Sequence, residues 1–126
     1  MAEFNGIISN FANDVDISFD WTITTVPALS TIASAEFTVK TVETDPDSAA
    51  ILVKIITPTN STGVGQVEDT GSDGTGKIRF DLTPTDTAKL TPGVIYVYWV
   101  YVILNSGQTT LVEKGSIFSA QGASHV

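Results

Sequence analysis

The sequence predicts an all-β sandwich, and three observations support this prediction. Apolar and polar residues alternate with a period of two in several segments, which is the pattern of strands with one buried face. Gly, Pro, Asn and Asp separate these segments at spacings typical of all-β chains. The chain has 126 residues, 42% of them apolar, and no cysteine, so it is long enough to build one core without disulfides. We therefore expect a single domain over residues 1–126.

The first strands follow from the alternation. Residues 17–24 and 33–40 each alternate apolar with polar side chains, and each is expected to be a half-buried strand. Pro27 separates them, because proline cannot donate a hydrogen bond to a central strand ladder. A turn is predicted at 43–48, and the β-branched run 51–56 predicts the next strand.

The middle of the chain predicts two further strands and one helical turn. A short strand at 64–67 lies inside a Gly- and Thr-rich stretch, and the alternation over 78–82 predicts another strand. A short helix is expected over Pro84–Leu90, because Thr83 is a suitable N-cap and Asp86 stands where the acid of a capping box belongs.

The remaining elements complete the sandwich. A long strand is predicted over 94–104, followed by an Asn-Ser-Gly turn and a last strand over 109–118. Residues 121–126 are expected to be a frayed tail. Together the elements predict an immunoglobulin-like β-sandwich of six to seven strands with one short helical turn, and a small β-barrel is the alternative.

The charge and the length of the apolar stretches indicate which classes of partner the protein is not expected to bind. Fourteen acidic residues stand against 6 basic ones, giving a net charge of −8, so no basic surface for nucleic acid or anionic lipid is expected. The longest apolar stretch, 94–104, is about half the length of a membrane-spanning helix. No signal peptide is recognised at the N-terminus, and the chain is expected to be soluble without a membrane partner.

Residues 77–118 resemble a known family. The stretch reads K-I-R-F-D-L-T-P-T-D-T-A-K-L-T-P-G-V-I-Y-V-Y-W-V-Y-V-I-L-N-S-G-Q-T-T-L-V-E-K-G-S-I-F. It resembles the Ig-like domains of tailed-bacteriophage virion structural proteins, including the N-terminal domain of baseplate upper proteins. The shared pattern is an apolar strand, the helical turn T-P-x-(D/E)-T-A-x-L, Pro-Gly, a Tyr-rich strand, a short turn, and Thr-Leu-Val followed by Gly. The resemblance implies the Ig-like fold and a structural role in a virion.

The Tyr-rich strand is apolar on both faces. The positions that match the family's core are Tyr96, Tyr98, Val100 and Val102. The other face must be covered either by this chain or by a neighbouring subunit. The residues of that second face, which form the predicted partner interface, are Ile95, Val97, Trp99, Tyr101 and Ile103.

The N-terminal segment is a second candidate for contact with a partner. Residues 1–13 have two interpretations: an arm that orders on a neighbouring subunit, or an edge strand of the sandwich. The apolar residues in this segment are Phe4, Ile7, Ile8 and Phe11.

Motifs for chemistry are weak in this sequence. Residues 71–77 fit G-x-x-x-x-G-K, but Ile78 follows where a nucleotide site needs Ser or Thr and the start of a helix. Asp69 and Asp73 are the weak calcium candidates, and Asx turns are the favoured interpretation. His125 lies beside the C-terminus, a poor place for a catalytic imidazole. We expect no catalytic residue, no cofactor and no metal ligand.

These observations favour a non-enzymatic bacteriophage virion protein. The first expectation is a capsid decoration, or cement, protein that docks on the major capsid protein or other virion proteins through its apolar face and self-associates on the virion. The alternative is a module of the tail baseplate or a fibre adaptor. The second alternative is a carbohydrate-binding or adhesion domain that uses exposed Trp and Tyr rings.

Overall fold

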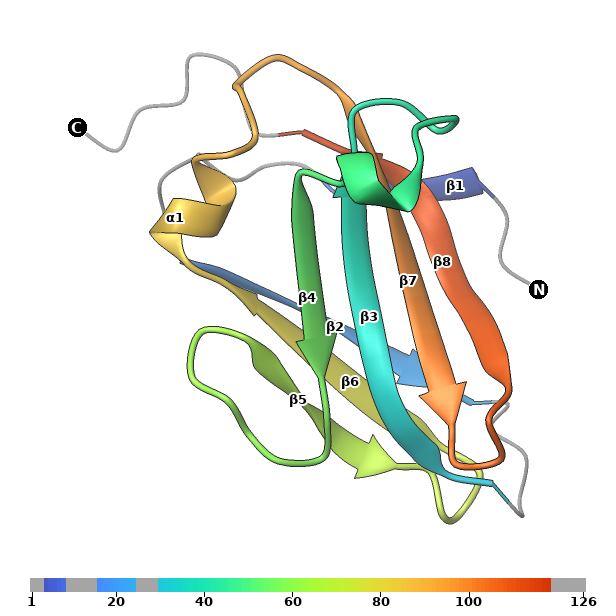
Figure 1. Ribbon diagram of the computed structural model, residues 1–126. Coiled ribbons are helices and arrows are strands. Elements are labelled where there is room, and N and C mark those ends of the chain that lie inside the picture. Colours follow the sequence, from blue (N-terminus) through green and yellow to red (C-terminus); the bar gives the residue numbers. More distant parts are fainter. Residues whose placement is uncertain (1–3, 9–15, 25–29, 119–126) are drawn as a thin grey trace.

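Two β-sheets pack face to face in the computed structural model, which describes residues 4–8, 16–24 and 30–118 (Figure 1). The larger sheet has the strand order β1-β8-β7-β3-β4 and the smaller one β2-β6-β5. The strands are β1 (Phe4–Ile8), β2 (Ile17–Ile23), β3 (Ile32–Lys40), β4 (Leu52–Ile56), β5 (Gly65–Thr70), β6 (Gly76–Leu82), β7 (Tyr96–Leu104) and β8 (Thr109–Ile117). The helical elements are the 3₁₀ turn η1 (Asp47–Ala49) and α1 (Pro84–Thr87).

Strand pairing is antiparallel except at one edge. Strands β8, β7, β3 and β4 pair antiparallel, as do β2, β6 and β5, whereas β1 pairs in parallel with β8. Two separate sheets face each other, so the predicted Ig-like β-sandwich is confirmed and the single barrel is not found. The described residues contain eight strands, more than the six to seven predicted, because β1 was not counted as a strand.

The core between the sheets is built around Phe37 of β3. This side chain has no exposed surface, and its ring centroid lies 5.6 Å from that of Phe80 and 5.7 Å from that of Tyr98. Phe19 and Trp21 of β2 pack against it from the other sheet at 6.1 and 6.3 Å. Aromatic rings from both sheets therefore meet at one point, where each removes a large apolar area from water.

The face of β7 that the sequence assigns to the core is buried as predicted. The exposed fraction is 6% for Tyr96, 0% for Tyr98 and Val100, and 1% for Val102. The pairing of β7 with β8 on one side and β3 on the other makes it a central strand. A central strand buries one full face in the sandwich, which accounts for the apolar residues on the core face of this run.

The register of β3 differs from the simple alternation. The sequence pattern places Ala33 on the core face, but Ile32 is the fully buried residue and Ala33 is half-buried. The pairing of β3 with β7 shifts between Ile32 and Ser34. One extra residue at such a shift moves the preceding side chains to the opposite face.

Helix α1 is shorter than predicted. Thr83 and Asp86 form the predicted capping box, in which the Thr83 oxygen accepts from the Asp86 N–H and the Asp86 carboxylate accepts from the Thr83 N–H. The helix ends at Thr87 instead of Leu90. Leu90 is fully buried, so the chain turns inward to insert this side chain into the core.

The N-terminal segment forms an edge strand where it is described. Residues 4–8 pair with β8, and Ile8 packs against the core. Of the two interpretations of this segment, the edge strand is the one found for these five residues. The rest of the proposed arm over 1–13, including Phe11, and the proposed tail over 121–126 lie outside the described residues.

Candidate docking face

The candidate site is the outer face of the larger sheet, which we call the docking face. It consists of the side chains of β3, β4, β7 and β8 that point away from the core. Along β7 these are Val97, Trp99, Tyr101 and Ile103, because they alternate with the buried residues of that strand. Opposite this row, the register of β3 places Lys40 beside Val97, Thr38 beside Trp99 and Glu36 beside Tyr101.

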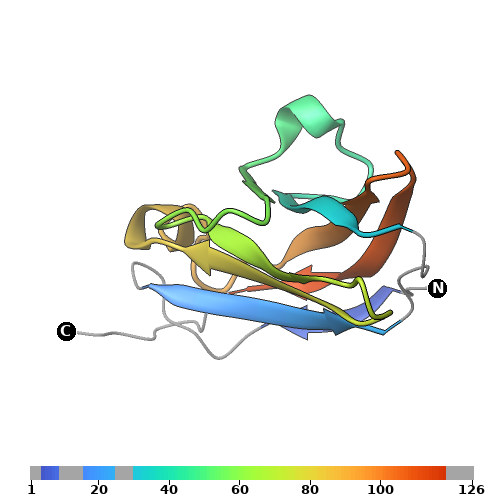
Figure 2. The ribbon, with the colours of Figure 1, turned by 90° about the horizontal axis from the view of Figure 1, so that it is seen from below.

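Trp99 is covered by its own chain. Only 9% of it is exposed, and the ammonium groups of Lys40 and Lys114 lie 5.0 and 6.0 Å from its ring centroid. Lys40 donates to the carbonyl of Asp45 at 3.1 Å, and Lys114 forms an ion pair with Glu43. Both acceptors belong to the β3–β4 loop, which projects from the larger sheet (Figure 2). Lys40 of β3 and Lys114 of β8, held by the β3–β4 loop, therefore cover Trp99 within its own chain. Trp99 does not need a partner to be buried.

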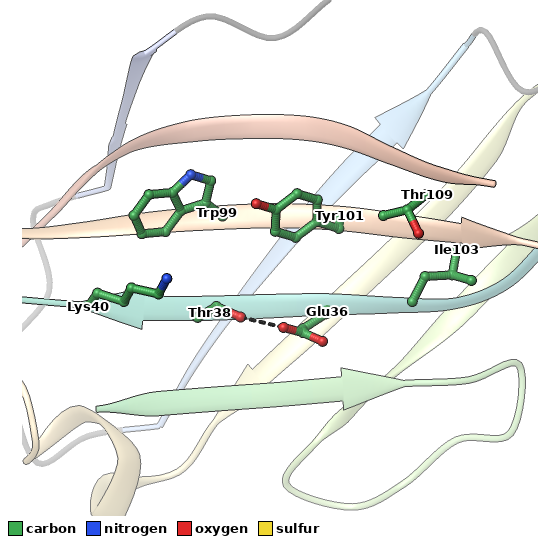
Figure 3. A pocket seen from close by; sticks show the side chains of 7 residues that line it. All are labelled: Glu36, Thr38, Lys40, Trp99, Tyr101, Ile103 and Thr109. Carbon is green, nitrogen blue, oxygen red and sulfur yellow. Dashed lines mark hydrogen bonds between the residues drawn. The ribbon is translucent and has the colours of Figure 1, made fainter. Parts of the chain in front are cut away.

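A groove lies beside the covered tryptophan. It encloses about 260 Å³ between the rows of β7 and β3 (Figure 3). Tyr101 and Ile103 are half-buried and supply its apolar side, while the Thr38 hydroxyl donates to the Glu36 carboxylate at 2.7 Å. The lining residues are Glu36, Thr38, Lys40, Trp99, Tyr101, Ile103 and Thr109.

The edge strand β4 extends the docking face. Val53 and Ile55 pair with Thr38 and Glu36 of β3, so they lie on the outer face, where they are 46% and 56% exposed. Within strands β3, β4, β7 and β8, these are the large apolar side chains that are exposed. The sequence analysis missed them as contact residues, although the run 51–56 is apolar at nearly every position and cannot bury both of its faces.

The predicted interface residues of β7 thus fall into three groups. Trp99 is buried under the loop, whereas Val97, Tyr101 and Ile103 are half-buried. Ile95 is 62% exposed but precedes β7, which begins at Tyr96, so it lies at the end of the docking face.

The outer face of the smaller sheet has the opposite chemistry. Arg79 donates to Asp81 at 3.1 Å and to Asn60 at 2.7 Å, and it forms an ion pair with Glu68. Ser18 also donates to Asp81, at 2.7 Å. The hydrogen bond to Asp81 is the main reason that the pKa of Arg79 is raised, and partial burial opposes it. This face is a polar network that water solvates.

A buried ion pair joins the edge strand β4 to α1. Lys54 lies 2.5 Å from the Asp86 carboxylate and also donates to the Gly63 carbonyl at 2.7 Å. Burial alone would raise the pKa of Asp86, but hydrogen bonds from Lys54 and Thr83 outweigh it and lower this pKa. Asp86 therefore stays ionised and holds the edge of the docking face in place.

The predicted chemical motifs form turns. Asp69 accepts from the Gly71 N–H at 2.9 Å and Asp73 from the Thr75 N–H at 3.2 Å, which are Asx-turn hydrogen bonds. The G-x-x-x-x-G-K stretch turns directly into strand β6. Within residues 4–8, 16–24 and 30–118, no three His, Cys, Asp or Glu side chains are grouped to hold a metal ion. His125 lies outside the described residues.

Neither of the described helical elements approaches the length or apolar character of a bilayer-crossing helix. No protein-family model and no curated protein sequence matches this chain. The resemblance to phage Ig-like domains stays a prediction carried by residues 77–118.

Proposed function

We propose that this protein is a non-enzymatic structural protein of a bacteriophage virion that attaches to neighbouring virion proteins through the docking face. Within the virion we propose the role of a capsid decoration protein. The observation that supports docking is the contrast between the two outer faces of the sandwich. One is a polar network, and the other carries exposed aliphatic side chains beside a groove.

Exposed apolar area is the source of the proposed attachment. Val53, Ile55 and Ile95 keep about half or more of their surface in water. Full burial of such a side chain stabilises by about 1.5–3 kcal/mol, so each of these three would contribute roughly 1 kcal/mol at a contact. Copies arranged on a lattice would add these modest contributions together.

The virion assignment rests on the family resemblance. The T-P-x-D-T-A-x-L stretch of that resemblance folds into a capped helical turn, and the Tyr-rich strand buries the face that the family pattern assigns to the core. These two elements support the resemblance at the level of fold. A baseplate or fibre-adaptor module would use the same docking face. Its position in the virion is therefore decided by whether the protein binds to capsids or to tails.

Carbohydrate binding receives less support than docking. A sugar-stacking site needs an aromatic ring with an accessible face. Trp99 lies under Lys40 and Lys114 with 9% of its surface exposed, which leaves Tyr101 as the half-buried ring of the groove.

The test is co-sedimentation of the purified protein with capsids and, separately, with tails of the virus that encodes it. We expect binding to capsids and at least a tenfold loss of binding for the double variant Val53→Asp, Ile55→Asp. The matched control is Thr22→Asp with Thr24→Asp, which adds the same charge to exposed positions on and beside β2. Equal binding by both double variants would contradict the docking face, and binding to tails alone would move the protein to the tail.

A further inference from the structure

We infer that the groove of the docking face receives a lysine or arginine side chain of the docking partner. This inference rests on the proposed docking function and names the chemistry of the contact. It starts from Glu36, which is the acidic residue among the described side chains that line the groove.

Within residues 4–8, 16–24 and 30–118, Glu36 forms no ion pair with a lysine or arginine side chain. All 6 lysines and arginines of the sequence lie in the described residues, and the side chain that contacts the Glu36 carboxylate there is Thr38. Lys40, which lines the same groove, lies four residues away on β3, about 13 Å along a strand. Its ammonium group donates to the Asp45 carbonyl at 3.1 Å and lies 5.0 Å from the centroid of the Trp99 ring. Among the described residues, the groove therefore contains a carboxylate that forms no ion pair and is available to a cation from outside.

The surroundings of Glu36 suit a long cationic side chain. Tyr101 is its cross-strand neighbour, so a cation that reaches the carboxylate also reaches an aromatic ring. Ile103 lies one step further along β7 and offers an apolar contact to the methylene stem of lysine or arginine. A groove of about 260 Å³ has room for one such stem in place of water molecules.

The same sheet face already binds cations in this way. Lys40 and Lys114 place their ammonium groups over Trp99 while oxygen atoms of the β3–β4 loop accept from them. A partner cation between Tyr101 and Glu36 would repeat this arrangement of ring and oxygen two residues further along β7. The net charge of −8 also attracts a basic partner from a distance.

The direct test is a nuclear magnetic resonance titration of the ¹⁵N-labelled protein with the capped tripeptide acetyl-Gly-Lys-Gly-amide. We expect saturable shifts of the amides of Glu36, Thr38, Tyr101 and Ile103. The same peptide with norleucine, which keeps the stem and lacks the charge, should bind at least threefold more weakly. The Glu36→Gln substitution should weaken binding of the lysine peptide at least threefold. The matched control, Asp20→Asn, removes one charge from an exposed position of β2 and should leave the titration unchanged.

Three results would overturn the inference. One is a lysine titration that Glu36→Gln does not weaken, and another is shifts that gather on β2 and β6 instead of the groove. The third is a neutral disaccharide that shifts the groove amides when the lysine peptide does not. Particle binding separates this inference from the proposed function. If Glu36→Gln binds capsids as tightly as the unaltered protein, the cation contact is wrong and docking stands. If the peptide binds as expected but no particle does, the proposed function is wrong and the cation site stands.

Discussion

The two outer faces of the sandwich use the same pleated backbone for opposite purposes. On the smaller sheet, Arg79 forms ion pairs with Asp81 and Glu68 and donates a hydrogen bond to Asn60. These polar side chains are therefore paired with one another. On the larger sheet, Val53 and Ile55 remain exposed. An antiparallel sheet needs only one buried face, and the second is normally solvated. The smaller sheet follows this rule, and the larger sheet departs from it.

This difference shows where a partner is to be sought. Surface ion pairs contribute little to stability and leave little apolar area for adhesion. A concentrated apolar patch on a sheet face, in contrast, marks a contact surface. On the larger sheet, the β3–β4 loop covers the apolar surface around Trp99, whereas Val53 and Ile55 stay exposed. The surface available for docking is therefore the part of this face that the loop does not cover.

The largest expected effect comes from breaking the core that holds the two faces back to back. Phe37→Ala should lower the free energy of unfolding by about 3–5 kcal/mol, because the ring is fully buried and joins aromatic rings from both sheets. Urea denaturation measures this loss. Thr22→Ala, at an exposed position of β2, is the control and should change the value by less than about 0.5 kcal/mol. A loss below about 1.5 kcal/mol for Phe37→Ala would mean that the sheets do not depend on this contact.

The next effect concerns the ion pair at the edge of the docking face. Asp86→Asn should cost about 1–3 kcal/mol, because it leaves Lys54 without its buried partner and weakens the capping box. The folded state lowers the pKa of Asp86, so its contribution is present above the ordinary value of 3.8 and is lost as the pH falls below it.

Free energies of unfolding measured at several pH values test whether the contribution of Asp86 falls on acidification. The difference between the unaltered protein and Asp86→Asn should be constant near neutral pH and should shrink below pH 3.8. A difference that grows on acidification would contradict the pair. Thr22→Ala, which removes no titratable group from the polar face, is the control and should show no such dependence.

A smaller effect is expected from the polar face itself. Arg79→Met should lower stability by about 1 kcal/mol, because it removes a shared partner of Glu68 and Asp81 and leaves their charges close together. Thermal unfolding measures the loss. Capsid binding should be unchanged, because Arg79 faces away from the docking face. If a folded Arg79→Met variant bound capsids more weakly, the contact would lie on the smaller sheet, and the proposed docking face would be wrong.

The smallest effect on stability, and the sharpest test of the loop cover, comes from Glu43→Gln. Its ion pair with Lys114 is half-exposed, so the cost should be a few tenths of a kcal/mol and should fall at high salt. Acrylamide should nevertheless quench Trp99 fluorescence more strongly, because Lys114 is released from its position over the ring. A Trp21→Phe background isolates this signal. Glu68→Gln, on the other face, should leave the quenching unaltered.

Local patterns were sufficient to predict most of the fold. The alternation over 17–24 predicts β2, and Thr83 and Asp86 form the predicted capping box. The core face of the Tyr-rich strand follows from the family resemblance instead, because this strand is apolar on both faces, and that face is buried. Two features were not predicted: the register shift of β3 against β7 next to Ser34, and the end of α1 at Thr87. Each depends on how a side chain packs against another element, which the local sequence does not show.

The candidate site was less accessible to sequence reasoning. Trp99 was expected to need cover, but nothing in its own segment shows that Glu43 and Asp45 would position two lysines over it. Glu36 looked like an ordinary polar residue in an alternating strand. Its significance depends on the groove, which forms only when β3 lies beside β7.

The parallel pairing of β1 with β8 has a consequence for how the chain folds. Phe4 pairs with Lys114, so the first described strand finds its place beside the last one. Closing so long a loop is slow, and a strand that waits for it stays open to wrong pairings. During synthesis, β1 must therefore remain unpaired while the strands between are made. We expect the completion of this sheet edge to be a late event in folding and the step most sensitive to a fusion at the N-terminus.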